Sequence, residues 1–244
     1  MKTKIILFYL LAFSICILSC TKYESNTTTT NPSTPEVIVP PAIKFFNVMD
    51  LGETRVALNS KQVTTVSKFF ASGYIPAVNG SNNIKLSFPN NTSLLDVNPT
   101  MANNNKYSGF FYRVGNEWKL NIVKDDLPKE ITNGFAALRI LDFRTEAYFN
   151  YINVRLISPG FDIIDQKNRN FLDHTTFDNL TKFQNAGAGT YTINMYNDTI
   201  TSSTRKDVKL DSKGIYSIIL TTPSNITPYT NAIYHIYPDV AKHN

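Results

Sequence analysis

The chain contains two segments that follow the same plan, and this internal repeat restricts the fold more than any other feature of the sequence. The first copy opens with AIKFFNVMD (Ala42–Asp50) and the second with AALRILDFR (Ala136–Arg144). Each segment has an alanine, an alternation of large apolar residues with one cation, an Asn or Asp, and another apolar residue. Because alternation with a period of two residues is typical of a half-buried strand, we expect each copy to begin with a β-strand.

Four further pairs of segments match between the copies, in the same order along the chain. They are TRVALNSK (Thr54–Lys61) with NYINVRLIS (Asn150–Ser158), FFASGYIPAVNG (Phe69–Gly80) with TFDNLTKFQNAGAG (Thr176–Gly189), NIKLSF (Asn83–Phe88) with TYTINMY (Thr190–Tyr196), and NNKYSGFFYRV (Asn104–Val114) with SKGIYSIILTT (Ser212–Thr222). The offset between the copies grows along the chain, and we place the corresponding insertion at Pro159–His174. A repeat of about 100 residues with several strands predicts tandem β-sandwiches, because the repeats of solenoids are shorter.

Turn signals agree with an all-β chain. Gly115-Asn116 separates two apolar runs and predicts a β-hairpin. After this turn, Trp118, Leu120 and Ile122 alternate with polar residues and should lie on one face of a strand. Helical periodicity is scarce, since only Thr175–Phe183 could form two helical turns, and this segment fits a loop equally well.

These patterns predict the organisation of the whole chain. We expect a first β-sandwich domain at residues 42–127 and a second at residues 128–244. The segment KDDLPKEITNG (Lys124–Gly134) is the predicted joint between them.

The amino-terminal residues have the pattern of an export signal. Lys2 and Lys4 are followed by an apolar run that is too short to span a membrane and has the length of a signal-peptide core. The run ends in Ile17-Leu18-Ser19-Cys20, which resembles the lipobox of bacterial lipoproteins. This resemblance implies cleavage of residues 1–19 and lipidation of the Cys20 thiol. The alternative is an ordinary cleaved signal in which the cysteine is incidental.

The distribution of cysteines favours lipidation. The chain has two cysteines, Cys16 and Cys20, so the residues that follow have none with which to form a disulfide. Residues 20–41, rich in Thr and Pro, should form a flexible, extended tether. Two or more acyl chains would hold such a protein durably on a membrane. We therefore expect a location in the cell envelope, on a bacterial membrane, with the outer membrane favoured and the protein facing either the periplasm or the exterior.

The chain also resembles the domain-of-unknown-function 4397 family, which is found as tandem copies in bacterial lipoproteins. The residues that carry the resemblance are IKFFNV and LRILDF, GTYTINMY, DSKGIYSIIL, and the join LNIVKDDLPKEITNGFAALRIL. Together they cover nearly everything from Ala42 to about Val240. The resemblance implies Ig-like or transthyretin-like sandwiches, and it implies no catalytic residue.

Composition and motifs argue against several functional classes. The chain has 24 basic and 19 acidic residues without a basic cluster, which does not favour nucleic-acid binding. No serine lies in a G-x-S-x-G motif. We expect His235 to lie on a strand face and His243 to be disordered at the terminus, so a catalytic triad is not expected. We therefore predict that the protein is not an enzyme and that it needs no cofactor.

Several acidic residues near the insertion could supply oxygen ligands to a metal ion. His174 lies near the acids Asp162, Asp165, Asp173 and Asp178, yet the spacing of a calcium-binding EF-hand is absent. We interpret these acids as solvated loop residues. Likewise we interpret Asp125-Asp126 as turn residues, because they precede Leu127-Pro128. No metal is therefore predicted.

Aromatic residues remain as binding candidates. Trp118, Tyr112 and Tyr148 could stack on a ligand, although core packing explains most aromatic residues of such a chain. The leading hypothesis is a lipoprotein without catalytic activity whose sandwiches bind a glycan or a protein. The alternatives are an adhesin or pilus-like assembly subunit and, less favoured, an accessory module of polysaccharide degradation. The sequence leaves the oligomeric state open.

Overall fold

A computed structural model describes residues 37–48, 52–68, 70–144, 151–159, 164–197, 200–221 and 237–243. The described chain is almost entirely β, and its helical residues form two short 3₁₀ helices, η2 (Asp173–Thr175) and η3 (Asp178–Thr181). The predicted all-β sandwich architecture is therefore confirmed. From Ile38 onward the chain forms one compact unit.

The first copy contains two four-stranded sheets. One has the order β10-β9-β1-β4 and the other the order β3-β2-β6-β7. Their strands are β1 (Ala42–Asn47), β2 (Thr54–Leu58), β3 (Lys61–Val66), β4 (Ile75–Pro76), β6 (Ile84–Ser87), β7 (Ser93–Val97), β9 (Lys106–Val114) and β10 (Glu117–Asp125). A small two-stranded sheet joins β5 (Gly80–Ser81) to β8 (Thr100–Met101).

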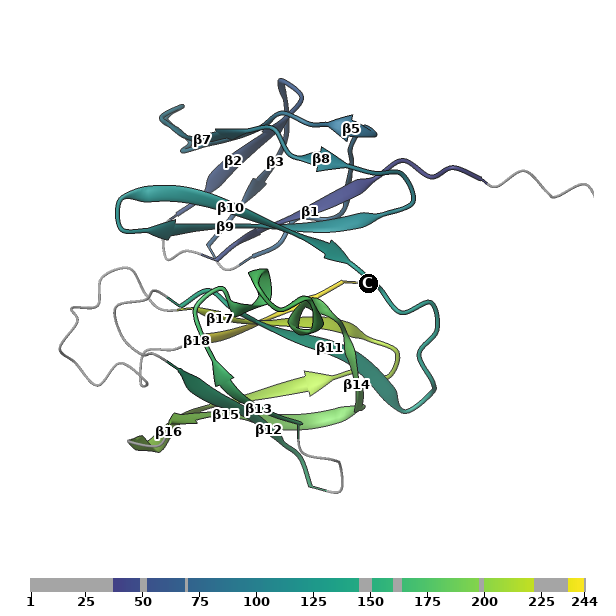
Figure 1. Ribbon diagram of the computed structural model, residues 1–244, viewed down its shortest axis with the longest axis vertical. Helices are drawn as coiled ribbons and strands as arrows, with labels where there is room; N and C mark the ends of the chain where they lie inside the picture. Colours follow the sequence, from purple (N-terminus) through teal and green to yellow (C-terminus); the bar gives the residue numbers. More distant parts are fainter. Residues whose placement is uncertain are drawn as a thin grey trace, which may run out of the picture. The chain divides into compact units, whose positions relative to one another are not determined.

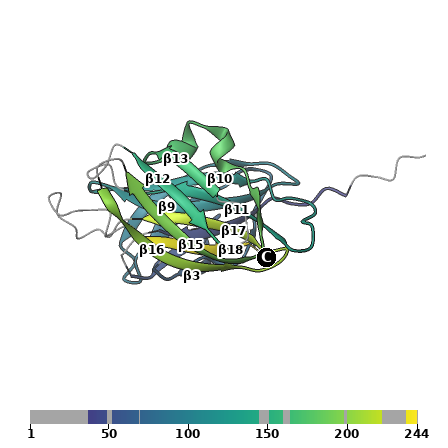
Figure 2. The same cartoon turned by 90° about the horizontal axis from the view of Figure 1, so that it is seen from below.

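The second copy repeats the two four-stranded sheets strand for strand, whereas β5 and β8 have no counterpart among its described strands. Its sheets have the orders β14-β11-β17-β18 and β13-β12-β15-β16, and Figure 2 shows the strands of the latter running side by side. The strands are β11 (Phe135–Asp142), β12 (Ile152–Ile157), β13 (Ile164–Arg169), β14 (Gln184–Gly187), β15 (Gly189–Asn197), β16 (Ile200–Leu210), β17 (Ile215–Thr221) and β18 (Tyr237–Lys242). The parallel pair β1–β9 corresponds to the parallel pair β11–β17. The internal repeat predicted from the sequence is thus present in the fold.

Each copy has an apolar core between its two sheets. Ile43 and Phe45 of β1 contribute to the first core, and Leu138 and Ile140 of β11 to the second. All four side chains are fully buried, and each contributes about 1.5–3 kcal/mol to stability. The alternation that predicts these strands therefore also identifies the residues that face the cores.

A third apolar cluster contains residues of both copies and lies on the faces of β1 and β11 that point away from the two cores. Both strands are labelled in Figure 1. Phe46 stacks on Phe110 of β9, with ring centroids 4.7 Å apart, and Phe110 lies 4.9 Å from Phe143, which follows β11. Leu141 of β11 belongs to the same cluster. Strands β1 and β11 are consequently buried on both faces, which explains why nearly every one of their residues is inaccessible.

The predicted hairpin at Gly115-Asn116 is confirmed as the turn between β9 and β10, and Gly115 has a φ of 57°. The prediction of one inserted block at Pro159–His174 is wrong, because β13 lies within it and corresponds to β3. The extra residues instead lengthen two connections. The connection from β12 to β13 is residues 158–163, against 59–60 between β2 and β3, and the connection from β13 to β14 is residues 170–183, against 67–74 between β3 and β4. That residues 42–127 and 128–244 fold independently stays a prediction.

Candidate functional site

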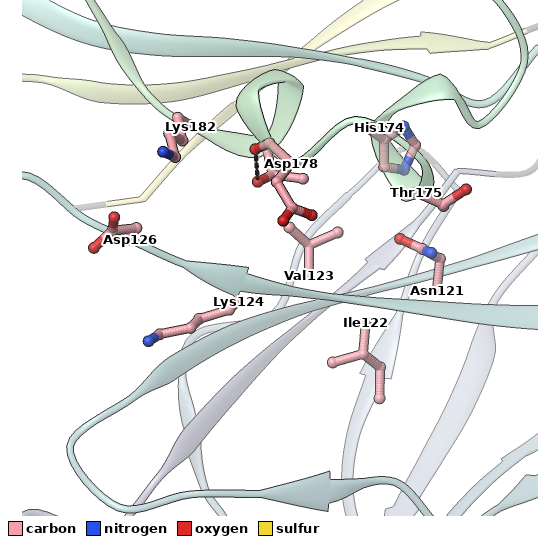
Figure 3. A pocket seen from close by; sticks show the side chains of 10 residues that line it. Asn121, Ile122, Val123, Lys124, Asp126, His174, Thr175, Asp178 and Lys182 are labelled. Atoms are coloured by element: carbon pink, nitrogen blue, oxygen red, sulfur yellow. Dashed lines mark hydrogen bonds between the residues drawn. The ribbon is translucent and has the colours of Figure 1, made fainter.

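A cavity of about 400 Å³ lies between strand β10 and the segment that carries η2 and η3 (Figure 3). This volume falls in the usual range of small-ligand sites. The residues that line it are Asn121, Ile122, Val123, Lys124 and Asp126 on one side, and His174, Thr175, Asp178, Thr181 and Lys182 on the other.

The 3₁₀ segment is fixed to β11 by buried hydrogen bonds. Arg169, at the end of β13, pairs with Asp173 at 2.6 Å and donates to the carbonyl oxygen of Ile140 at 2.9 Å. The backbone N–H of Leu172 donates to the carbonyl oxygen of Asp142. Asp173 is therefore a buried structural residue, and our interpretation of it as a solvated loop acid is wrong. Its role is to hold one wall of the cavity in place.

His174 occupies the inner wall of the cavity. The residue is only 2% exposed, its ring lies 4.9 Å from that of Phe143, and neither ring nitrogen has a hydrogen-bond partner. Burial lowers its pKa to about 4, an effect that nearby Asp173 opposes only in part. The ring is therefore neutral at pH 7 and has one donor and one acceptor to offer.

Asn121 of β10 lies on the opposite wall, and Figure 3 shows its amide and the His174 ring on facing sides. Its side-chain Oδ1 is buried and also lacks a partner. A buried polar atom without a hydrogen bond costs about 1–3 kcal/mol. Asn121 and His174 thus leave unused hydrogen-bonding capacity at the cavity, which small rotations of either side chain could direct toward a ligand.

The remaining charged residues of the lining are two cations and two anions. Lys124 and Lys182 are exposed, as are Asp126 and Asp178. Within the described part of the chain, none of the four belongs to an ion pair. The lining is therefore electrically balanced, which does not favour a ligand of high net charge.

A buried polar network adjoins the cavity, with Arg139 of β11 at its centre. The Arg139 guanidinium donates to Asp125 at 2.6 Å, to Ser217 at 2.8 Å and to Ser108 at 3.3 Å. It also donates to the carbonyl oxygen of Thr181, at 3.4 Å. Our interpretation of Asp125 as a turn residue is wrong, because its carboxylate is the buried partner of Arg139.

His243 belongs to the same network, so our expectation that it is disordered is wrong. It is 6% exposed; its Nε2 lies 2.8 Å from the Ser217 hydroxyl and its Nδ1 lies 3.2 Å from the Tyr74 hydroxyl. Tyr74 in turn donates to Asp125 at 2.7 Å. Burial lowers the pKa of His243 to about 3 and raises that of Tyr74, so both groups are neutral at pH 7.

This hydrogen-bonded series contains a serine, a histidine and an aspartate, but it lacks the access that a nucleophilic site requires. Ser217 is fully buried, and its hydroxyl oxygen already accepts the hydrogen bond from Arg139 Nε. A substrate carbonyl could not approach it without separating the two copies, because Arg139, which contacts Ser217, also contacts Ser108 and Asp125 of the first copy. The network therefore joins the two copies and holds both walls of the cavity.

Tyr112 and Trp118, the two predicted stacking residues that the structure describes, do not line the cavity. Tyr112 is buried against Phe143 and Phe171, with ring centroids at 5.4 and 6.1 Å, so the structure does not support it as a stacking residue. Trp118 is half-buried and packs against the first core, with its ring edge-on to Phe88 at 5.9 Å. Tyr148, His235 and the lipidation candidate Cys20 lie outside the described residues.

The sequence singles out three of the lining residues, His174, Asp178 and Asp126, only as loop or turn residues, and it does not indicate that they share a cavity with Asn121. Asn121 alternates with the apolar face of β10, which would indicate a solvent-facing side chain, and His174 has no motif around it. Among the described residues, no helix is long and apolar enough to cross a membrane. In the same residues, no group of three or more His, Cys, Asp or Glu side chains could hold a metal ion.

No protein-family model matches the chain, and no curated protein matches it. The resemblance to the domain-of-unknown-function 4397 family therefore stays a prediction from the sequence.

Proposed function

We propose that the chain is a lipoprotein of the bacterial cell envelope, anchored through Cys20, that binds a ligand in the cavity between β10 and the η2–η3 segment. The leader sequence supports the anchor. The observation that carries the binding function is the pair of unpartnered polar groups, His174 and Asn121, on facing walls of a cavity of ligand size.

The chemistry of the lining supports a polar ligand of low net charge. His174 is neutral at pH 7, and the two lysines are balanced by the two aspartates. Such a site offers hydrogen bonds in both directions, and a ligand that forms them recovers the cost of the buried unpartnered atoms.

The same lining supports binding without catalysis. The nearest carboxylate oxygen to the His174 ring, on Asp173, is 4.0 Å from Nδ1, beyond hydrogen-bonding distance. A general base needs a partner that orients it and a nucleophile within reach. In the described residues, neither ring nitrogen of His174 has a hydrogen-bond partner of either kind.

A volume-preserving substitution tests the site. Asn121→Leu removes the amide while filling the same space, and Asn185→Leu, at the exposed position of β14, is the matched control. We would screen the full chain in detergent against oligosaccharides and short peptides, then measure affinity by calorimetry. A ligand of this cavity should bind the Asn121 variant at least about tenfold more weakly, as expected for the loss of one or two hydrogen bonds. Equal affinities for both variants would place the ligand elsewhere.

The anchor has a separate test. Mass spectrometry of the native protein should show an amino-terminal Cys20 that carries acyl groups. An unmodified amino terminus would contradict the proposed location.

A further inference from the structure

We propose that the ligand of the cavity is an extended polypeptide segment, which adds to the free edge of β10 as a further strand of the sheet. This inference rests on the proposed function, since it assumes that the cavity binds a ligand. It identifies the ligand class from the geometry of β10.

Strand β10 is the last strand of its sheet. In the order β10-β9-β1-β4, β9 is its only strand partner among the described residues. The outer edge of such a strand presents backbone N–H and C=O groups that can pair with another chain.

The hydrogen bonds of β9 determine which residues of β10 have free backbone groups. The carbonyl oxygens of Asn105 and Phe111 accept from Ala42 and Val48, so the odd-numbered residues of β9 point toward β1. Even-numbered residues of β9 therefore point toward β10, because the direction alternates along a strand.

The pairing register transfers this alternation to β10. Phe110 is opposite Asn121 and Ser108 is opposite Val123, so these two residues of β10 pair with β9. Ile122 lies between these two residues and Lys124 follows Val123. The N–H and C=O groups of Ile122 and Lys124 therefore point away from β9, toward the open edge of the sheet.

The cavity lies along this free edge. Successive side chains of a strand lie on opposite faces, yet four consecutive residues, 121 to 124, all line the cavity. A cavity that contacts both faces of a strand must lie beside its edge. It therefore adjoins the outward N–H and C=O groups of Ile122 and Lys124.

An extended peptide matches these groups in spacing and direction. Four residues of strand span roughly 13 Å and offer two N–H and two C=O groups on the outer edge. Alternate side chains of the peptide would face His174, Asn121 and Asp178, which favours small polar residues such as Ser, Thr and Asn there. Main-chain hydrogen bonds would give affinity, and this wall would give specificity.

A saccharide matches the cavity less well. Its hydroxyl groups do not repeat with the spacing of a strand edge. Moreover, none of the ten lining residues is Phe, Tyr or Trp, so the cavity lacks an aromatic surface for a sugar ring. The observations therefore favour a peptide over the glycan that the sequence also suggests.

The test uses one position with two substitutions. Lys124→Pro removes the outward N–H without affecting the pairing with β9, and proline is tolerated at such edge positions. Lys124→Ala removes the same ammonium group but keeps the N–H, and is the matched control. The probe is a library of hexapeptides with Thr at alternate positions and uncharged residues between them, presented to the full chain in detergent.

For library members that bind, we expect Lys124→Pro to weaken affinity about tenfold or more, whereas Lys124→Ala should change it less than about threefold. The best peptide, N-methylated at alternate residues, should likewise lose binding to the unaltered chain. This second measurement needs no protein variant and remains decisive if Lys124→Pro does not fold.

Other outcomes would overturn the inference in distinguishable ways. Peptide affinity that is unchanged by N-methylation at either set of alternate residues would show that the edge is not used. An oligosaccharide that binds and is sensitive to Asn121→Leu, with no peptide binding, would preserve the proposed function and reject the peptide. If neither class binds, both proposals fail.

Discussion

Arg139 Nη2 donates to Asp125 Oδ1 at 2.6 Å, and both side chains are completely buried. The ion pair joins β11 of the second copy to β10 of the first. Contacts between the copies explain why the opening segment of each copy has a cation among its apolar residues, Lys44 in the first copy and Arg139 in the second. Arg139 is opposite Ser217 in the second copy, as Lys44 is opposite Ser108 in the first. Both cations face the other copy, and Lys44 donates to the carbonyl oxygen of Lys242.

Removal of the buried acid should be strongly destabilising. Asp125→Ala leaves the Arg139 guanidinium buried without a counter-ion, and such losses cost about 3–5 kcal/mol. Denaturant unfolding of the full chain measures this change. The exposed pair of Lys85 and Asp96 provides the control, since Asp96→Ala should have a much smaller effect. Equal losses for the two variants would contradict a dominant role for the buried pair.

His243 is the position of the second copy that is equivalent to Asp125. Val123 is opposite Ser108 in the first copy, and Ala241 is opposite Ser217 in the second. Asp125 lies two residues after Val123, and His243 lies two residues after Ala241. We therefore expect Asp125→His combined with His243→Asp to be less destabilising than Asp125→His alone, since the acid returns to the vicinity of Arg139. A double-mutant cycle should give a coupling of about 1 kcal/mol or more. Additive effects would show that the two positions are not interchangeable.

Acid should destabilise the chain through its two buried histidines. The pKa of His174 is about 4 and that of His243 about 3, below the ordinary value of 6.5. Above pH 6.5 both are neutral in the folded and unfolded states. As the pH falls below 6.5, the unfolded state binds protons that the folded state cannot, so stability decreases until the pH passes the folded pKa. Each histidine should cost roughly 2–3 kcal/mol at pH 4.5 relative to pH 7.

Denaturant titrations at pH 7 and pH 4.5 check this expectation. His174→Gln and His243→Gln should each have a smaller difference between the two pH values than the unaltered chain. The same difference in all three proteins would mean that these histidines are not buried in the neutral form.

Gly214 precedes β17, where an added Cβ would overlap the Tyr216 ring. Gly214→Ala should therefore destabilise the chain by about 1–3 kcal/mol through overpacking. Gly52→Ala is the control, because among the described residues no heavy atom beyond its chain neighbours lies within 4 Å of the added Cβ there. Thermal unfolding of both variants distinguishes the two sites, and a Gly214 variant as stable as the Gly52 variant would contradict the contact.

The sequence predicts the part of the fold that depends on local patterns. Alternation identifies the strands, and it places Trp118, Leu120 and Ile122 on one face, which the structure packs against the first core. Matching segments predict a repeated topology. These signals are local because the period of a strand and the chemistry of a turn are set by neighbouring residues.

The candidate site depends on contacts between distant parts of the chain, and the sequence gives no local sign of them. Asp125 and Arg139 occupy strand positions whose side chains point away from the cores, and His243 directly follows β18; alternation assigns such positions to solvent. They are buried because a second sandwich covers that face. His174 is likewise buried by its position above Phe143. The cation shared by the two opening segments is the one sequence feature that indicates a common role for the faces of β1 and β11 that point away from the cores.

The free edge of β10 is the feature on which the account of ligand binding most depends. Residue-resolved amide hydrogen exchange of the full chain without ligand measures it directly. We predict that the amides of Ile122 and Lys124 exchange at least about tenfold faster than those of Asn121 and Val123, because only the latter pair with β9. Equal protection of all four amides would show that the edge is already covered and would contradict the account.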